Sequence, residues 1–405
     1  MRPQKPTNSL ANYIGATSMG SFASVGDRTI AEPTHMRART YLALEIGEAC
    51  QLKCRHCIYH RPKSSNPKPN AEVLTQVSQS LGPRFDPDWV TLAGKEPTLF
   101  PEQLLMTARQ VFKPDRTSIL MTNGLLLTND LLKELAGVID VFDISVDGTK
   151  QAHDWMRGPG TYKQTWDRIR FIAANYPNRI GIIATAVHSN TLSGHPQYID
   201  LLDLASEIGT SFSNEGRVVL TISLYFGRPD DPMRLTIDDL LNIITGLRAA
   251  DCPSRVLITS AYSHLWPAVA RELKIRTKNV EFDESMGLPL VKLGNVTLIL
   301  FNLTDVPQIS IRVSNDGLIY LGCNHLVLGD RAEDYAIASL ADSSFIDVVG
   351  GLVDGTNPVF EKFRDTPEDC LACEDFDLCR AGDRVAGMYF GGSCVDPYCP
   401  LISRQ

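Results

Sequence analysis

The sequence predicts an α/β fold, a partial (β/α)6 barrel of the TIM type followed by a cysteine-rich C-terminal domain. Two observations predict it. Short apolar, β-branched runs alternate with helical patterns from residue 40 to about residue 225, and six of the ten cysteines fall within residues 323–399. Alternating strands and helices form a parallel sheet with right-handed crossovers. Clustered cysteines in a chain without a secretory signal indicate metal ligands rather than disulfides.

The expected strands are short and apolar, as is typical of strands buried on both faces of a parallel sheet. In the barrel they are Tyr41–Ile46, Trp89–Ala93, Ser118–Thr122, Val141–Val146, Ile180–Val187 and Val218–Leu224. The helices expected between them include Pro101–Val111, Asp130–Ala136 and Gln164–Asn175. Beyond the barrel we expect helices over Thr236–Ala249 and Leu265–Leu273, and strands over Arg255–Ser260, Leu290–Asn302 and Gln308–Val313.

The chain divides by composition into four expected parts. Residues 1–38 are rich in Pro, Ser, Thr, Gly and Asn and are expected to form an arm or a lid. Residues 39–230 form the barrel, and residues 231–310 form a bridging α/β region. Residues 311–405 form the cysteine-rich domain, which opens with a hairpin.

The overall composition is that of an ordinary globular protein, with 43% hydrophobic and 21% charged residues. A net charge of −8 and a pI near 5.5 argue against a broad nucleic-acid-binding face. The longest apolar runs are too short to span a membrane, and the first 25 residues lack the apolar core of a secretory signal. We therefore expect a cytoplasmic protein without membrane or nucleic-acid partners.

A three-cysteine motif follows the first expected strand. Cys50, Cys54 and Cys57 have the spacing Cys-x3-Cys-x2-Cys. Thiolates are soft ligands that favour iron–sulfur clusters or zinc. A closed structural site needs four protein ligands, so three thiolates on a cubane would leave one iron open to a small molecule. The alternative is half of a zinc knuckle, in which Cys54, Cys57 and His60 supply ligands.

Polar or glycine-rich segments follow three further strands, and a parallel barrel brings such strand ends to one rim. The segments are residues 93–97 (Ala-Gly-Lys-Glu-Pro), residues 121–124 (Met-Thr-Asn-Gly), and residues 144–148 (Ile-Ser-Val-Asp-Gly) with His153, Arg157 and Gly158 beyond. Each segment alone is also compatible with a turn, and the first with a helix cap. Together with the cysteines they predict a site on the rim.

These motifs resemble those of the radical S-adenosylmethionine (radical SAM) superfamily. The resemblance implies that Cys50, Cys54 and Cys57 hold a [4Fe–4S] cluster, whose open iron chelates S-adenosylmethionine. Reduction then releases a 5′-deoxyadenosyl radical that takes a hydrogen atom from substrate. The remaining cofactor-binding residues implied by the resemblance are His56 near the adenine, Gly94 and Glu96 at the methionine amine, and Ser145 and Arg157 at the ribose and carboxylate. Lys95 departs from the Gly-Gly-Glu-Pro pattern of the family.

The cysteine-rich tail resembles the SPASM/twitch-type extension of radical SAM enzymes, which carries auxiliary iron–sulfur clusters. Its candidate ligands are Cys323, Cys370, Cys373, Cys379, Cys394 and Cys399. The pattern is incomplete, because Asp383 stands where a cysteine is expected and residues 253–322 contain no cysteine. We expect at least one auxiliary [4Fe–4S] cluster, with Cys399 or Cys394 as its fourth ligand. The alternative is a zinc ribbon on Cys370, Cys373, Cys379 and Cys399.

The resulting prediction is an S-adenosylmethionine-dependent oxidoreductase that abstracts a substrate hydrogen and drives an oxidative cross-link or dehydrogenation. A ribosomally made peptide is the expected substrate, and a sugar or other small molecule oxidised or epimerised in natural-product biosynthesis is the alternative. A reducing partner such as flavodoxin or ferredoxin is expected. No catalytic side chain is expected beyond the cluster and cofactor, because the cofactor carries the chemistry. A rival of another class is a non-catalytic iron–sulfur or zinc protein.

Overall fold

The computed structural model describes most of the barrel region and part of the tail. The residues that it describes are 40–59, 67–177, 179–188, 201, 219–224, 231–249, 255–259, 266–275, 281–283, 288–294, 296–299, 309–322, 326, 328–353, 356–358, 368–374, 376, 387 and 399.

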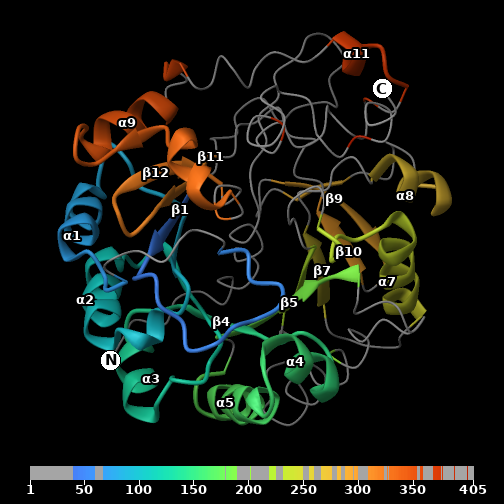
Figure 1. The fold of residues 1–405 in the computed structure, drawn as a ribbon, viewed down its shortest axis with the longest axis horizontal. Helices are drawn as coiled ribbons and strands as arrows, with labels where there is room; N and C mark the ends of the chain where they lie inside the picture. The colour runs from blue at the N-terminus through green and yellow to red at the C-terminus, as the bar shows by residue number, and fades with distance from the viewer. Residues whose placement is uncertain are drawn as a thin grey trace.

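The described strands form one 13-stranded sheet, in which β1 to β7 pair in sequence order and run parallel. The strands are β1 (Thr40–Glu45), β2 (Trp89–Ala93), β3 (Thr117–Thr122), β4 (Val141–Ser145), β5 (Ile180–Ala186), β6 (Val219–Leu224), β7 (Arg255–Thr259), β8 (Glu281–Asp283), β9 (Leu288–Leu293), β10 (Val296–Ile299), β11 (Ile309–Val313), β12 (Leu318–Leu321) and β13 (Ala338–Ser339). This confirms the predicted α/β class with a partial TIM-type barrel (Figure 1).

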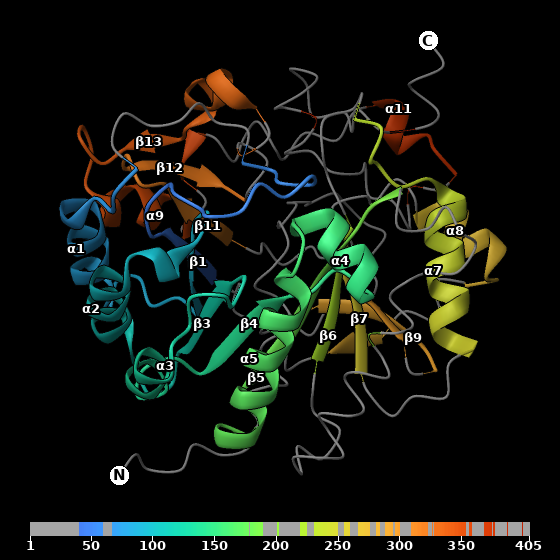
Figure 2. The same cartoon turned by 60° about the horizontal axis from the view of Figure 1, so that its bottom comes forward.

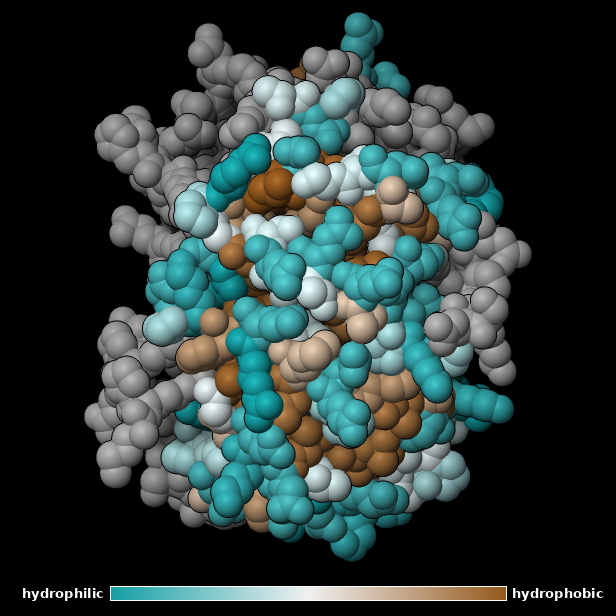
Figure 3. Space-filling model, turned by 90° about the vertical axis from the view of Figure 1, so that its left-hand side faces the viewer, coloured by the Kyte–Doolittle hydropathy of each residue, from teal (hydrophilic) through white to brown (hydrophobic). Residues whose placement is uncertain are grey.

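Helices follow the strands and cover one face of the curved sheet (Figure 2). The helices are α1 (Ala71–Ser80), α2 (Pro101–Val111), α3 (Asn129–Leu135), α4 (Lys150–Arg157), α5 (Thr161–Asn175), α7 (Ile237–Ala249), α8 (Trp266–Glu272), α9 (Phe345–Val353) and α11 (Glu368–Leu371), with 3-10 turns η1 (Pro97–Leu99) and η7 (Gly329–Tyr335). Seen from the side of α1, α2 and α9, hydrophilic residues cover much of the surface, with hydrophobic residues between them (Figure 3). Helices α1 and α2 each bury one side, with Val73, Leu74 and Val77 in α1 and Leu104, Ala108 and Val111 in α2.

The two faces of the sheet differ in what they bury, because side chains alternate along each strand. Residues such as Leu44, Leu92 and Leu120 point toward the helices and belong to the main hydrophobic core. The alternate residues face away from the helices, and we call this the inner face of the sheet. At the amino ends of the strands the inner face is filled by Tyr41 and Trp89, whose rings stack 4.7 Å apart.

Beyond the stacked rings the inner face is partly accessible at four positions, although Glu45 and Ala93 at the ends of β1 and β2 are buried. Ala43, Met121, Ser145 and Thr185 all lie on it and are partly exposed, whereas their helix-facing neighbours are buried. The accessible end of the inner face is thus the rim on which chemistry is expected in a parallel barrel.

The predicted strands of the barrel match the observed ones to within a residue at each end, and the helices to within three residues. One expectation was wrong. Residues 290–302 were expected to form a single strand, but β9 and β10 are separate antiparallel strands. Gly294, with a φ of 68°, lies between them, and glycine adopts this left-handed conformation without a steric penalty.

The first part of the cysteine-rich region continues the sheet. Strand β11 pairs in parallel with β1, and the predicted hairpin is present as antiparallel β11 and β12. The boundary expected at residue 311 therefore lies within a strand of the common sheet. The four-part division of the chain stays a prediction. Within the part of the chain that the structure describes, we find no helix that combines the length and apolar character needed to cross a membrane.

The difference between the two faces can be tested with two neighbouring residues of β3. Leu120→Ala should lower the free energy of unfolding by about 2–5 kcal/mol, because it leaves a cavity in the main core. Met121→Ala, on the partly exposed inner face, should cost clearly less. Urea unfolding of the two variants measures the difference, and equal losses would contradict the assignment of the faces.

Candidate active site

The three predicted cluster cysteines lie in the cysteine loop, which we define as the described residues 46–59 and 67–70 between β1 and α1. Cys50 and Cys54 are partly buried, Cys57 is exposed, and all three are free thiols. Burial raises the pKa of Cys54 to about 11, and the Cys57 and Cys50 thiols add to this rise. Burial also raises the pKa of Cys50, with a further contribution from Cys57. The three thiols therefore lie within electrostatic reach of one another.

Helix α4 anchors the middle of the cysteine loop. The Arg55 N–H donates to the carbonyl of Met156 at 2.9 Å, and Arg55 Nε donates to the carbonyl of Trp155 at the same distance. The Arg55 guanidinium also lies 4.4 Å from the centroid of the Trp155 ring, a cation–π contact. Ile58 packs against buried Met156 and Val187. The loop is thus attached to α4 on both sides of Cys57.

Gly94, predicted to bind the cofactor, permits a close approach between the end of β2 and the start of the cysteine loop. The Ile46 N–H donates to the carbonyl of Ala93 at 2.7 Å. Gly94 has a φ of 135°, and a Cβ there would lie 3.0 Å from the Gly47 carbonyl oxygen and 3.2 Å from Ile46 N. Only glycine fits this conformation and this space.

Glu96 is buried and uses its carboxylate to join the ends of β2 and β3. Oε1 accepts hydrogen bonds from the Thr98 N–H at 3.1 Å, from the Thr98 hydroxyl, and from the Thr122 hydroxyl at 2.6 Å. Oε2 accepts from the Asn123 N–H at 2.9 Å. The helix-cap alternative considered for this segment is therefore present, since Glu96 caps η1. Its charge also reaches Cys50 and helps to raise the pKa of that thiol, after burial.

Gln51, a residue that the sequence did not single out, connects the cysteine loop to the β3 turn. Its Nε2 donates to Asn123 Oδ1 at 3.2 Å, and the Leu125 N–H donates to the same oxygen at 3.0 Å. The Thr165 hydroxyl donates to the Asn123 carbonyl at 3.0 Å. Asn123 therefore holds Gln51, which is the residue directly after Cys50.

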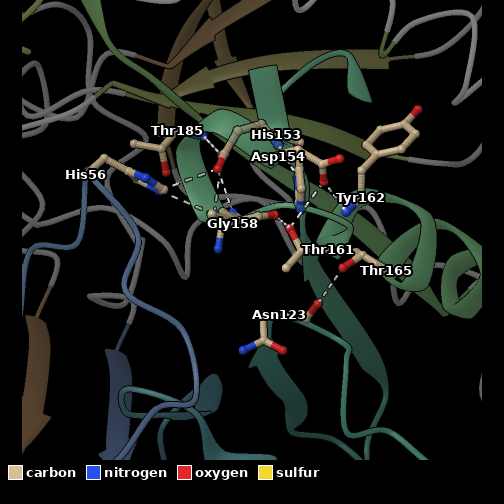
Figure 4. Close-up of polar contacts among 11 residues, drawn as sticks. His56, Asn123, His153, Asp154, Gly158, Thr161, Tyr162, Thr165 and Thr185 are labelled. Atoms are coloured by element: carbon tan, nitrogen blue, oxygen red, sulfur yellow. Dashed lines mark hydrogen bonds and ion pairs between the residues drawn. The ribbon is translucent and has the colours of Figure 1, made fainter. Parts of the chain in front are cut away.

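The centre of the site is the fully buried carboxylate of Asp147. It accepts hydrogen bonds from Arg157 Nε at 2.5 Å, from Arg157 Nη2 at 3.2 Å, and from the Thr185 N–H at 3.0 Å. His56 Nε2 lies 3.6 Å from Oδ2. Figure 4 shows His56, from the cysteine loop, and Thr185, from β5, converging from different elements. Burial acts to raise the pKa of Asp147, but Arg157 and His56 outweigh it, so the pKa lies well below its usual range.

His56 and His153 flank this carboxylate as neutral imidazoles. Burial, followed by the charge of Arg157, lowers the pKa of His153 to about 4. Burial likewise lowers the pKa of His56 to about 4, with Asp147 opposing and Arg157 reinforcing the shift. Arg157 Nη2 lies 3.3 Å from His56 Nε2, and the Asp147 N–H donates to His153 Nδ1 at 3.2 Å.

Because the Asp147 N–H can only donate, neutral His153 carries its proton on Nε2, whereas His56 Nε2 lies near both a donor, Arg157 Nη2, and an acceptor, Asp147 Oδ2. His56 Nδ1 and His153 Nε2 are buried without a hydrogen-bond partner among the described residues. Buried polar atoms of this kind normally have a partner, and an absent ligand is one explanation for an orphan. His56 Nδ1 is thus a buried polar atom that a polar ligand beside the cysteine loop would satisfy.

Arg157 places a positive charge beside the thiols. Its charge lowers the pKa of Cys54 and Cys50 against the larger effect of burial. Burial acts to lower the pKa of Arg157 itself, but Asp147, Cys54 and Cys57 raise it. A guanidinium in this position favours thiolates, the form in which cysteine binds metals.

The described part of the cysteine loop offers three free thiols as metal donors. Among the described residues, no group of three or more His, Cys, Asp or Glu side chains is arranged to hold one metal ion. Three cysteines of a cubane each bind a different iron, so they need not converge on one point. His60, the further ligand of the zinc-knuckle alternative, lies outside the described residues. Cys50, Cys54 and Cys57, supported by Arg157, fit a three-thiolate cluster.

Ser145, the remaining predicted cofactor residue, ends β4 on the inner face and is partly exposed. In the tail, Cys370 and Leu371 are the last two residues of α11. The Cys373 N–H donates to the Cys370 carbonyl at 3.1 Å. Cys399 is partly buried. Cys323, Cys379 and Cys394 lie outside the described residues, so the auxiliary ligand set stays a prediction.

Sequence comparison matches part of the chain to a known superfamily. Residues 44–202 match the family model described as the Radical SAM superfamily. Over 177 residues the chain is 24% identical to an S-adenosylmethionine-dependent nucleotide dehydratase of a Thermoplasmatales archaeon (strain ISO4-H5). That match covers 42% of this chain and 60% of the dehydratase, less than two thirds of the length of that relative.

Solved structures with the same fold cover most of the chain. The structure of polyhistidine-tagged anSMEcpe with bound AdoMet has a TM-score of 0.59 at 16% identity and covers 90% of this chain and 91% of its own. The crystal structure of Streptococcus suis SuiB bound to S-adenosylmethionine has a TM-score of 0.58 at 17% identity, covering 90% of this chain and 78% of its own. At such identities these similarities show a shared fold.

The buried, neutral state of His153 makes the stability of the metal-free full chain depend on pH. In the unfolded chain this imidazole binds a proton below about pH 6.5, whereas in the folded chain it does so only near pH 4. The contribution of neutral His153 to the free energy of unfolding is therefore complete above pH 6.5. It is lost as the pH falls from 6.5 to 4, which lowers the free energy of unfolding by up to about 3 kcal/mol. His153→Gln, which cannot titrate, should show a shallower fall in urea unfolding between pH 7.5 and 4.5. Equal pH dependence in both proteins would contradict the assignment.

Proposed function

We propose that this chain, whose residues 44–202 match the model of the Radical SAM superfamily, is a radical SAM enzyme that reductively cleaves S-adenosylmethionine to drive an oxidative modification of a ribosomally made peptide. The modification would be a cross-link or a dehydrogenation. The observation that carries the proposal is the placement of Cys50, Cys54 and Cys57 on the barrel rim, within electrostatic reach of one another and of Arg157.

Cys50, Cys54 and Cys57 would hold a [4Fe–4S] cluster on this rim. When bound, the cluster and S-adenosylmethionine would together supply reductive cleavage of the sulfonium and abstraction of a substrate hydrogen atom. The chain itself contributes placement and charge. Gly94 lets β2 approach the cysteine loop, and Gln51 holds the loop against the β3 turn. Arg157, fixed by Asp147, offsets the negative charge of the thiolates.

The remaining candidates would contact S-adenosylmethionine. His56 Nδ1 is a buried polar atom without a partner among the described residues, which supports a contact with the cofactor. Ser145 is partly exposed on the inner face and offers a hydroxyl there. The carboxylate of Glu96 already accepts four hydrogen bonds from the protein, so we propose that it shapes the cofactor site by fixing the β2 and β3 turns.

A peptide substrate is supported by the fold. Among the structures with this fold, SuiB is bound to the precursor peptide SuiA and anSMEcpe to the Cp18Cys peptide, at TM-scores of 0.56 and 0.55 and 16% identity. A second candidate is a small-molecule substrate, which the sequence match to a nucleotide dehydratase favours. That match covers 42% of this chain and 60% of the dehydratase.

The tail would add an auxiliary [4Fe–4S] cluster of the SPASM type, held by Cys370, Cys373, Cys379 and either Cys399 or Cys394. Such a cluster could accept the electron left when a substrate radical is oxidised, as a net oxidation requires. A flavodoxin or ferredoxin would supply electrons to the first cluster. The spacing Cys-x2-Cys-x5-Cys in residues 370–379 supports this assignment.

The central proposal predicts that the anaerobically reconstituted and reduced protein releases 5′-deoxyadenosine and methionine from S-adenosylmethionine. Cys54→Ala should abolish the release, because two thiolates cannot hold a cluster with one open iron. Cys252→Ala, which removes a cysteine outside both proposed ligand sets, serves as the matched control and should keep the activity. Chromatography of the products gives the answer, and wild-type release from the Cys54→Ala protein would refute the assignment.

The tail proposal predicts iron that is independent of the cysteine loop. Replacing Cys50, Cys54 and Cys57 together by Ala should leave about four irons per chain, the content of one [4Fe–4S] cluster. Metal analysis and the visible absorption of the cluster report the result. Zinc in place of iron in this triple variant would favour the zinc-ribbon alternative and remove the proposed redox role of the tail.

A further inference from the structure

The hairpin of β11 and β12 contacts the cysteine loop, although it lies far outside the residues that match the superfamily model. Strand β11 pairs in parallel with β1, from whose end the cysteine loop starts, and Arg312 lies opposite Ala43 in this register. Figure 1 shows β11 and β12 beside β1. The chain thus brings Arg312 and Tyr59, which are 253 positions apart, into one structural unit.

Arg312 of β11 contacts the part of the cysteine loop that follows Cys57, and it does so from the inner face of the sheet. Its Nε donates to Glu45 Oε1 at 2.6 Å, and both side chains are buried. Its Nη2 donates to the Tyr59 hydroxyl, and its guanidinium lies 5.6 Å from the centroid of the Tyr59 ring. Tyr59 is two residues beyond Cys57. One planar guanidinium therefore links the end of β1 to the end of the cysteine motif.

Asn315, in the turn of the hairpin, holds the far end of the cysteine loop. Its Oδ1 accepts from the Asn70 N–H at 2.9 Å, and its Nδ2 donates to the Lys68 carbonyl at 2.9 Å. Asn70 in turn caps α1 by accepting from the N–H groups of Glu72 and Val73. The Glu48 N–H donates to the Pro67 carbonyl at 2.9 Å, which brings the two ends of the loop together.

We propose that the β11–β12 hairpin is a clamp, in which Arg312 and Asn315 are positioning residues that hold the cysteine loop in the shape that receives a cluster. A loop of this length loses conformational entropy when its thiols are ordered, and contacts that restrict it beforehand reduce that cost. The superfamily domain alone lacks these two side chains. The part of the chain beyond it is therefore needed to complete the cluster site.

The purpose of the clamp rests on the proposed function, but its existence can be tested on the thiols themselves. The full chain, freed of iron with a chelator, is treated with iodoacetamide, and alkylation of Cys54 and Cys373 is followed in the same sample by mass spectrometry. Arg312→Gln should raise the alkylation rate of Cys54 about tenfold, as expected for losing hydrogen bonds made by a charged donor. The rate at Cys373 should not change.

Arg331→Gln is the matched control, because Arg331 also donates to a tyrosine hydroxyl, that of Tyr335 at 2.6 Å, and stacks on its ring. It should leave the rate at Cys54 unchanged. Two milder variants cover the case in which Arg312→Gln fails to fold by leaving Glu45 buried without its partner. Tyr59→Phe and Asn315→Ala both keep the Arg312–Glu45 pair and should still raise the rate at Cys54 severalfold.

The reconstituted full chain supplies a second readout. Release of iron to a chelator should be faster in Arg312→Gln than in Arg331→Gln if the clamp serves a cluster. An unchanged rate at Cys54 in the folded clamp variants would overturn the proposal. A parallel rise at Cys373 would do the same, because it would indicate general destabilisation. If the alkylation result holds but the wild-type chain binds no cluster, the clamp stands and the proposed function fails.

Discussion

The ion pair between Asp147 and Arg157 is the interaction on which the rest of the site depends. Both groups are buried, and removing either one would leave an uncompensated charge away from water, which is strongly destabilising. The pair gathers four elements, because Asp147 follows β4, Arg157 ends α4, and the other contacts come from β5 and the cysteine loop. Burial keeps the two neighbouring histidines neutral by lowering the pKa of each, and Arg157 acts in the same direction while Asp147 opposes it. The same ion pair thus places the positive charge of Arg157 and contacts the cysteine loop.

Much of the fold could be predicted because its causes are local in the sequence. Strands such as Trp89–Ala93 and helices such as Pro101–Val111 are continuous apolar or periodic segments, and their observed bounds agree with the expected ones. The single strand expected over residues 290–302 failed because Gly294 permits a turn inside an otherwise strand-like run. Such a turn depends on backbone conformation, which an apolar pattern does not encode.

The sequence could predict several residues of the site but not the contacts that these residues make. The spacing of the cysteines and the strand-end segments identified Glu96, Arg157 and His56, yet their partners come from other parts of the chain. Gln51 meets Asn123 across 72 positions, and Arg312 meets Tyr59 across 253. No local pattern distinguishes a glutamine or an arginine that makes such a contact from one on the surface. Asp147 illustrates the same limit, since the motif drew attention to Ser145 while the nearby carboxylate holds the site together.

The stacked rings of Tyr41 and Trp89 have a consequence for access to the inner face of the sheet. They fill that face at the amino ends of β1 and β2, while Ala43, Met121, Ser145 and Thr185, farther along their strands, are partly exposed. The inner face of β1 and β2 is therefore packed at one end, and the side from which it can be approached along these strands is the one that carries the cysteine loop.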